Sequence, residues 1–211
     1  MDSSFWYNLL LALLGFFGTQ AAEVGIPSWL QPGVDFVKES GRRAAEADAA
    51  ASFAARVTAV SDGDSIRVTD GNGRVRRVRL AYIDAPELQQ AGGVAARDAL
   101  RQRLTGRQVQ VLVFEQDQYR RDVAQVRDNG EDVGLAQIEN GHAWHYASYA
   151  KRGQNKADYA GYAYAEAVAR QQRRGLWQAQ NPQAPWAYRK AQRESQQPAG
   201  RQTGAAFDAL W

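Results

Sequence analysis

The chain has 211 residues, of which 45% are hydrophobic and 23% are charged, with a net charge of +3. This composition is typical of an ordinary globular protein, and the length allows one good-sized domain with extensions or at most two small domains. No cysteine is present, which excludes disulfides and thiolate metal sites. Any metal must therefore bind oxygen ligands or the two histidines, His142 and His145.

An apolar segment, FWYNLLLALLGFFG, covers residues 5–18 and is followed by small residues. It is short for a membrane span of about 20 residues, but it is typical of the hydrophobic part of a signal peptide. Asp2 stands where a basic residue is usual, which leaves an uncleaved anchor as the alternative. We therefore expect residues 1–22 to be a signal peptide or a membrane anchor, and the protein to be exported (secreted or periplasmic) or attached to a membrane through residues 5–18.

Residues 23–55 are expected to connect this segment to a folded domain. Pro27 and Pro32 mark a turn-rich stretch, and the alanine-rich, charged sequence of residues 34–55 predicts a helix.

The central region, residues 56–178, combines strand and helix patterns. Alternating apolar residues predict strands, and Gly71-Asn72-Gly73 between two of them predicts a hairpin. Helical spacing and stop signals predict helices in the three segments GGVAARDALRQRLTG (92–106), VGLAQIENG (133–141) and KADYAGYAYAEAVARQQRRG (156–175). Five short strands with about three helices indicate a small barrel of the α+β, β-rich class.

The C-terminal region, residues 179–211, is expected to be a largely disordered extension. From about Ala191 it is rich in Gln, Ala and Gly. Its last residues, FDALW, are compatible with a docking peptide or with a merely adhesive end.

Carboxylates follow or precede apolar strand residues in two places. Asp62 and Asp64 flank Gly63 just before one strand, and Asp84 follows the apolar Ile83 at the end of another, with Glu87 three residues on. A buried carboxylate is costly without a positive partner. Two carboxylates at strand ends make an oxygen site for a hard divalent cation plausible.

Arginines complete the set. Arg79 precedes Asp84 by five residues, and Arg121 lies in a predicted loop between strands. A divalent cation, two guanidinium groups and a further carboxylate are the parts required for phosphodiester hydrolysis, because they take up charge at phosphorus and activate water. A surface ion-pair network is the alternative interpretation for any single pair.

The motifs DGDS, VRLAYIDAPE, DQYRRDVAQV, NGEDV, ENGHAW and RRGLW follow one another in this order. From Arg56 to Trp177 the sequence resembles the thermonuclease, or staphylococcal nuclease-like, family, and NPQAPWAYRK resembles the tail of bacterial members. The resemblance implies a five-stranded OB-type Greek-key barrel and Ca²⁺-dependent cleavage of DNA and RNA.

The resemblance also implies roles for individual residues. Asp64, Asp84 and the backbone carbonyl of Ala85 would bind one Ca²⁺, which would be the positive partner of Asp84, with Asp62 in the outer shell. Glu87 would hold the attacking water, Arg79 and Arg121 would clamp the scissile phosphate, and Tyr119 would contact a terminal phosphate. Arg120 replaces a glycine of the family pattern, so the loop that carries Arg121 is expected to be stiffer or differently turned; Arg120 itself is a further candidate phosphate contact.

Aromatic and basic residues after position 143 are candidates for contact with unstacked bases. Trp144, Tyr146, Tyr149 and Lys151 are compatible with a stacking wall, whereas burial over the barrel explains Trp144 equally well.

Three functions are therefore compatible with the sequence: an endonuclease, an OB-fold module that binds nucleic acid with weakened catalysis, and a membrane-tethered structural or virion component that uses the barrel as a scaffold. Retention of all the carboxylates and arginines favours the endonuclease. The oligomeric state is not predicted by any pattern in the sequence.

Overall fold

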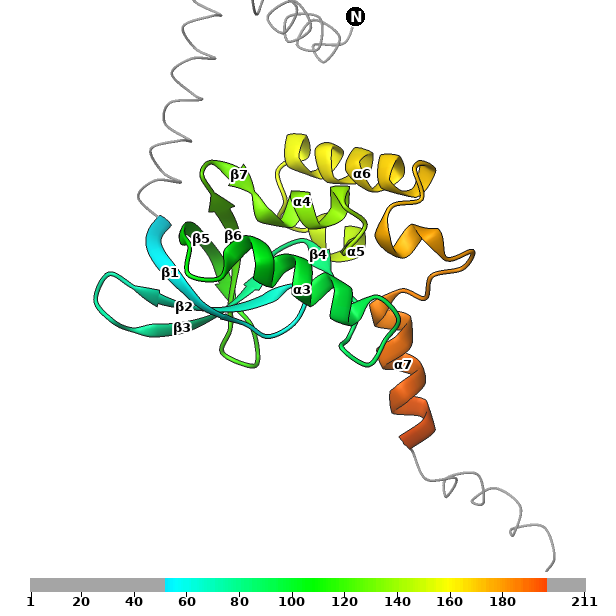
Figure 1. Cartoon of the computed structure of the whole chain (residues 1–211), viewed down its shortest axis with the longest axis horizontal. Coiled ribbons are helices and arrows are strands. Elements are labelled where there is room, and N and C mark those ends of the chain that lie inside the picture. Colours follow the sequence, from blue (N-terminus) through cyan, green and yellow to red (C-terminus); the bar gives the residue numbers. More distant parts are fainter. Residues whose placement is uncertain (1–51, 197–211) are drawn as a thin grey trace, which may run out of the picture. The chain divides into compact units, whose positions relative to one another are not determined.

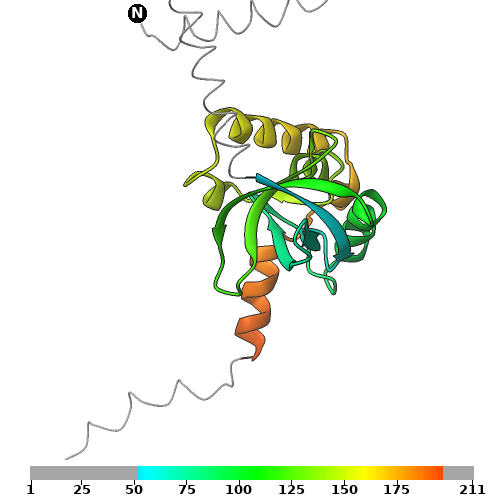
Figure 2. The ribbon, with the colours of Figure 1, turned by 90° about the vertical axis from the view of Figure 1, so that its left-hand side faces the viewer.

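Five strands close into a barrel in the computed structural model, which describes residues 52–196 (Figure 1). The sheet has the order β3-β2-β1-β5-β6-β7, and a parallel pairing of β3 with β6 closes it. The view turned by 90° shows the strands curving around a common interior (Figure 2). The predicted α+β class and OB-type barrel are confirmed. The strands are β1 (Ser52–Val60), β2 (Ser65–Asp70), β3 (Val75–Leu80), β5 (Gln108–Gln116), β6 (Asp122–Asp128) and the short β7 (Glu131–Asp132).

Alternation along the strands decides which side chains enter the barrel. In the hairpin of β2 and β3, the apolar residues Ile66, Val68 and Val78 are at most 2% exposed. The arginines that alternate with them, such as Arg67 and Arg77, face solvent. The period of two thus places the apolar face in the core and the basic face outside.

Helices cover the barrel on different sides. Helix α3 packs against β1 through its fully buried Ala96, Leu100 and Leu104, spaced four residues apart as the sequence predicted. Helices α4 and α6 lie together on another side (Figure 1). The helices are α3 (Gly93–Leu104), α4 (Val133–Glu139), α5 (Ala147–Ala150), α6 (Lys156–Gln171), the 3₁₀ helix η1 (Gly175–Gln178) and α7 (Pro185–Gln196).

A small second sheet joins the barrel to the helical side. It pairs β4 (Ile83–Asp84) with β8 (Trp144–His145), and Asp84 lies opposite Trp144. This pairing fixes the carboxylate of Asp84 beside the segment that follows α4.

Gly63 lies in close contact with α3. A Cβ atom at this position would lie 2.7 Å from the Cβ atoms of both Ala85 and Ala96. The buried amide of Gln137 in α4 donates to the Gly63 carbonyl at 2.8 Å and to the Ala96 carbonyl at 3.3 Å. The turn between Asp62 and Asp64 is therefore held by both helices.

Two predicted boundaries differ from the structure. The helix expected over residues 34–55 does not include residues 52–55, which belong to β1 because Ala55 faces the core; the rest of that helix lies outside the described residues. The extension expected to be disordered begins with helix α7, which is stabilised by Pro185 in its first turn and by the packing of Trp186.

The predicted N-terminal signal or anchor also lies outside the described residues. Within residues 52–196, no helix is long and apolar enough to cross a membrane.

We predict that Gly63→Ala lowers the free energy of unfolding by about 1–3 kcal/mol, because the added methyl group overpacks the contact with Ala85 and Ala96. Urea denaturation measures this change. Gly71→Ala is the matched control, since nothing lies within 4 Å of a Cβ atom there. Equal stability of the two variants would contradict the close packing at Gly63.

Candidate functional site

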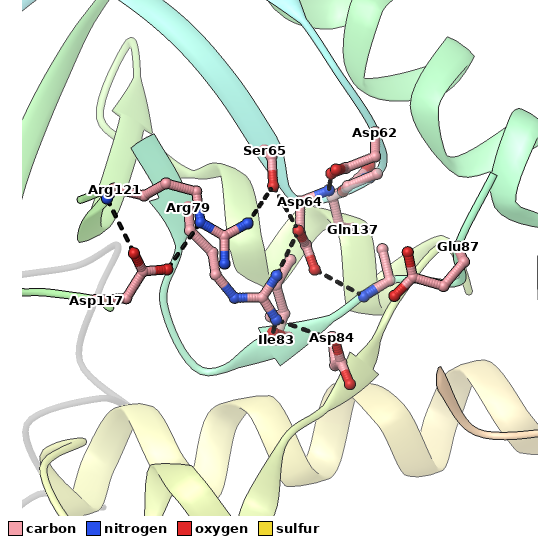
Figure 3. Close-up of polar contacts among 12 residues, drawn as sticks. Asp62, Asp64, Ser65, Arg79, Ile83, Asp84, Glu87, Asp117, Arg121 and Gln137 are labelled. Atoms are coloured by element: carbon pink, nitrogen blue, oxygen red, sulfur yellow. Dashed lines mark hydrogen bonds and ion pairs between the residues drawn. The ribbon is translucent and has the colours of Figure 1, made fainter. Parts of the chain in front are cut away.

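Asp64 and Asp84 come together at the strand ends, and Arg79 of β3 bridges them. Arg79 Nη1 donates to Asp64 Oδ1 at 2.7 Å, and Nη2 donates to Asp84 Oδ1 at 3.0 Å (Figure 3). Asp64 is 3% exposed and Asp84 is fully buried. The two like charges are thus compensated by a guanidinium group that lies on the closing strand of the barrel.

The remaining contacts of the Asp64 side chain come from Ser65 and from the backbone of Ala85. Ser65 Oγ donates to Asp64 Oδ1, and the Ala85 amide donates to Asp64 Oδ2, each at 3.0 Å. The Asp64 amide in turn donates to Asp62 Oδ1 at 3.0 Å. Side chain and backbone therefore fix the turn before β2 against the residue that follows β4.

A second arginine, Arg189 of α7, completes the set around Asp84. Its Nη2 donates to Asp84 Oδ2 at 2.7 Å, and its Nη1 lies 3.2 Å from Asp84 Oδ1 and 2.9 Å from Glu87 Oε1. In this structure the positive partners of Asp84 are thus Arg79 and Arg189, whereas the sequence led us to expect a cation in this role. The motif YRK contains Arg189, but no spacing in the sequence links it to a carboxylate 105 residues earlier.

The acceptor capacity of the two carboxylates fits a hard cation. Each carboxylate oxygen can accept two hydrogen bonds. Among the described residues, Oδ2 of Asp64 accepts one hydrogen bond and so does Oδ2 of Asp84. One lone pair on each oxygen thus remains, and carboxylate oxygens are ligands that Ca²⁺ prefers. Within residues 52–196, no group of three or more His, Cys, Asp or Glu is arranged to hold a metal ion.

Burial makes the acidic side chains of the site hard to ionise without further positive charge. Burial raises the pKa of Asp62 to about 6, and repulsion from Asp64 adds to this effect. Burial also raises the pKa of Asp84, although the hydrogen bond from Arg189 acts in the opposite direction. A bound cation would favour the ionised form of both side chains.

Arg121 is positioned by Asp117, at the other end of its loop. Arg121 Nε donates to Asp117 Oδ2 at 2.7 Å, while the amides of Tyr119 and Arg121 donate to Asp117 Oδ1 at 2.9 Å. Arg121 Nη1 lies 3.5 Å from Ser65 Oγ, which connects this arginine to Asp64. Figure 3 shows Arg79 and Arg121 on the same side of Ser65.

Arg120 adopts a left-handed conformation, with φ of 56°, which a glycine adopts without strain. Its amide donates to the Asp117 carbonyl at 2.9 Å, so the loop closes normally. The substitution thus adds backbone strain without releasing Arg121 from Asp117.

A cavity of about 210 Å³ lies beside the two arginines. Five of the residues predicted from the sequence line it, namely Arg79, Arg121, Tyr119, Tyr146 and Tyr149. Tyr149 also donates a short hydrogen bond to Glu115 at the rim. Lys151, by contrast, is an exposed residue outside the lining of this cavity.

Trp144 does not take part in a stacking wall for bases. It is 8% exposed, meets Trp177 edge to face at 4.4 Å, and lies 4.8 Å beneath the guanidinium group of Arg170. Its role is to pack the helices on β8, because burial of the large apolar ring stabilises the fold more than exposure of it would. His145 is also a packing residue, with Nε2 3.0 Å from Gln154 Oε1.

The larger cavity, of about 630 Å³, is lined by residues near Glu87 and Arg189 in the chain, but not by Asp64, Asp84 or Glu87 themselves. Its lining includes Gln89, His142, Leu176 and Tyr188, but no Asp, Glu, Lys or Arg. We therefore place the chemistry at the smaller cavity, where charged groups converge.

Comparisons with known proteins agree with this geometry. Residues 77–179 match the sequence profile of the family described as staphylococcal nuclease homologue. The probable staphylococcal-like nuclease CAN2 of Oryza sativa subsp. japonica is 37% identical over 126 residues, 60% of this chain and 32% of the relative. The staphylococcal-like nuclease CAN1 of Arabidopsis thaliana is 40% identical over 117 residues, 56% of this chain and 34% of the relative.

A bacterial relative is matched over most of its length. An uncharacterized endonuclease of Escherichia coli is 38% identical over 135 residues, 64% of this chain and 83% of the relative. The chain thus spans about a third of the length of the plant relatives.

We predict that Arg120→Gly raises the free energy of unfolding by about 0.5–1 kcal/mol. Removal of the left-handed strain, roughly 1–2 kcal/mol, outweighs the greater entropy of glycine in the unfolded chain. Arg120→Ala is the control, since it keeps a Cβ atom at positive φ and gains nothing. Urea denaturation of both variants tests this, and equal gains would show that the side chain, not the backbone, is the cause.

We predict that the stability of the cation-free protein falls as pH rises from about 4 to 6 through Asp62. Because the folded pKa is about 6 and the ordinary value is 3.8, the folded state binds the extra proton in this range and loses it as pH rises. Asp62→Asn should remove this slope and be more stable at pH 7 by on the order of 1–3 kcal/mol. Urea denaturation in EGTA, with the exposed Asp98→Asn as control, measures it; parallel pH profiles for wild type and Asp62→Asn would contradict the shift.

Proposed function

Because the chain belongs to the family of staphylococcal nuclease homologues, we propose that it is a Ca²⁺-dependent endonuclease that hydrolyses phosphodiester bonds of DNA and RNA with little sequence specificity. The observation that carries the proposal is that Arg79 and Arg121 line one cavity, while Arg79 also donates to the carboxylates of Asp64 and Asp84. Such a site can bind a phosphodiester and activate water next to it.

The arginines are the phosphate-binding groups in this proposal. Guanidinium groups stay charged at all relevant pH values and match phosphate oxygens with paired N–H groups. Arg79 and Arg121 both line the cavity, and both are fixed by carboxylates, Arg79 by Asp64 and Arg121 by Asp117. Their preorganisation favours the charge that develops on phosphorus during hydrolysis.

Asp64 and Asp84, with the backbone carbonyl of Ala85, are the residues that would hold one Ca²⁺. When bound, the ion supplies positive charge at the phosphate oxygens. Asp62, whose side chain anchors the Asp64 amide, supports these ligands from outside. The raised pKa values of Asp62 and Asp84 agree with a site that is completed by a cation.

Glu87 is the proposed general base. Its side chain is 39% exposed, so water reaches it, and it lies within reach of the same guanidinium group as Asp84. As the water oxygen forms its bond to phosphorus, Glu87 takes the proton, and one ester P–O bond breaks. The departing oxygen leaves protonated by solvent.

The cavity supports recognition of unpaired strands rather than of sequence. Its wall includes the exposed ring of Tyr119, which can stack on any base, while a duplex groove would require a projecting element to read base edges. We propose that single-stranded or flexible substrate is cut faster than rigid duplex. Export or membrane attachment through residues 1–22 remains part of the proposal, on the sequence pattern alone.

We predict that the purified full chain cuts single- and double-stranded oligonucleotides in Ca²⁺ and not in EGTA. Glu87→Gln should lower the rate constant by about 10²–10⁴-fold, because the general base is lost. Glu139→Gln, an exposed change at the end of α4, is the matched control and should cut like wild type. A folded wild type that binds oligonucleotides in Ca²⁺ without cutting them would favour the binding module instead.

A further inference from the structure

Helix α7 is anchored next to the strand that carries Asp84. The ring of Trp186 stacks on Tyr146 with centroids 5.4 Å apart and planes at 12°, and it meets Trp144 edge to face at 5.5 Å. Trp144 is the residue paired with Asp84 across the β4–β8 ladder. The start of α7 is therefore fixed within one residue pair of a proposed metal ligand.

Arg189 follows Trp186 by three residues, so both side chains lie on the same face of α7. The anchored tryptophan thus directs Arg189 at the acidic site. There the guanidinium group bridges Asp84 and Glu87, with Nη1 shared between Asp84 Oδ1 and Glu87 Oε1. A guanidinium group between two carboxylates compensates their mutual repulsion, and its planar fork fixes both.

Glu87 depends on this contact for its orientation. It lies in the loop between β4 and α3, outside any helix or strand. Among the described residues, Arg189 is the one group that donates to the Glu87 carboxylate, and it donates to Oε1. Oε2 accepts no hydrogen bond from residues 52–196, so it is the oxygen left to accept a proton from water.

The loop is tied to the same C-terminal segment at a second point. The Gln90 side chain donates to the Gln183 carbonyl at 2.5 Å, just before α7, and Gln90 also accepts from the Glu87 amide at 3.3 Å. The backbone of Glu87 is therefore connected to Gln183 through Gln90, and its side chain contacts Arg189 directly.

Two other roles for Arg189 agree less well with its contacts. A phosphate-binding arginine would line the cavity with Arg79 and Arg121, whereas Arg189, like the Glu87 to which it donates, does not line it. An arginine that blocks the cation would use up the acceptor capacity of Asp84, yet one lone pair on Asp84 Oδ2 remains beside Arg189.

We propose that Arg189 is a positioning residue, which holds Glu87 through Oε1 so that Oε2 receives the proton of the attacking water. This inference rests on the proposed nuclease function. It makes α7 a part of the active site, although the helix lies outside the segment that matches the family profile, residues 77–179.

The test compares Arg189→Gln and Arg189→Lys with Arg193→Gln, an exposed arginine one turn further along α7. All variants are full-length chains assayed on a single-stranded oligonucleotide in Ca²⁺. Arg189→Gln should lower kcat by about 10²-fold, because the base is misplaced, while KM changes by less than about threefold. Arg189→Lys should recover part of kcat, since its single point charge reaches one carboxylate but cannot bridge two. Arg193→Gln should match wild type.

A second measurement tests the contact without catalysis. Unfolding by urea in EGTA is compared for wild type, Arg189→Gln, Glu87→Gln and the double variant. If the side chains interact, the change in unfolding midpoint of the double variant is smaller than the sum of the single changes. Additive changes would overturn the proposal.

The kinetic outcomes separate this inference from the proposed function. A wild type that does not cut would contradict both the nuclease function and the positioning role of Arg189. A wild type that cuts, with kcat retained in Arg189→Gln, would end the positioning role alone. A rise in KM with unchanged kcat would identify a phosphate contact, and a rise in kcat would identify a blocking arginine; either result overturns the proposal.

Discussion

The structure depends on compensation of buried negative charge at the start of β2 and the end of β4. Asp64 and Asp84 are almost inaccessible to water, and Arg79 donates to both. A buried ion loses several kcal/mol of hydration, which only close partners with good geometry can offset. This requirement explains why the carboxylates are surrounded by guanidinium, hydroxyl and amide donors, and why burial still raises the pKa of Asp84.

The barrel supplies the geometry that this compensation needs. Parallel pairing of β3 with β6 closes the sheet, with Arg79 opposite Val123, and it brings the loop of Arg121 to the same cavity. Gly63 lets the turn before β2 approach α3 to a distance that no side chain would permit, and Gln137 binds that turn to α4. Functional groups thus come from elements whose positions are set by the core, and small changes in packing are transmitted directly to the carboxylates.

Helix α7 supplies a further positive charge to the buried carboxylates from the C-terminal part of the domain. Trp186 packs its partly exposed ring against Tyr146 and Trp144, and one turn later Arg189 reaches the acidic site. The aromatic contact therefore has a consequence for the chemistry, because it decides where a charged group on an otherwise exposed helix lies. A positive charge delivered from this helix completes the balance around Asp84 and Glu87.

Local sequence determined much of the protein. Period-two alternation in β2 and β3, the glycine turn between them and the spacing of α3 predicted these elements, since the backbone alone sets such periods. The order of short motifs identified Asp64, Asp84, Arg79 and Arg121 as residues of one site. Only the tertiary structure decided that Trp144 is a packing residue and that Arg189 contacts Glu87, 102 residues earlier in the chain. Such pairings depend on how separate elements pack against one another, and no local periodicity encodes that distance.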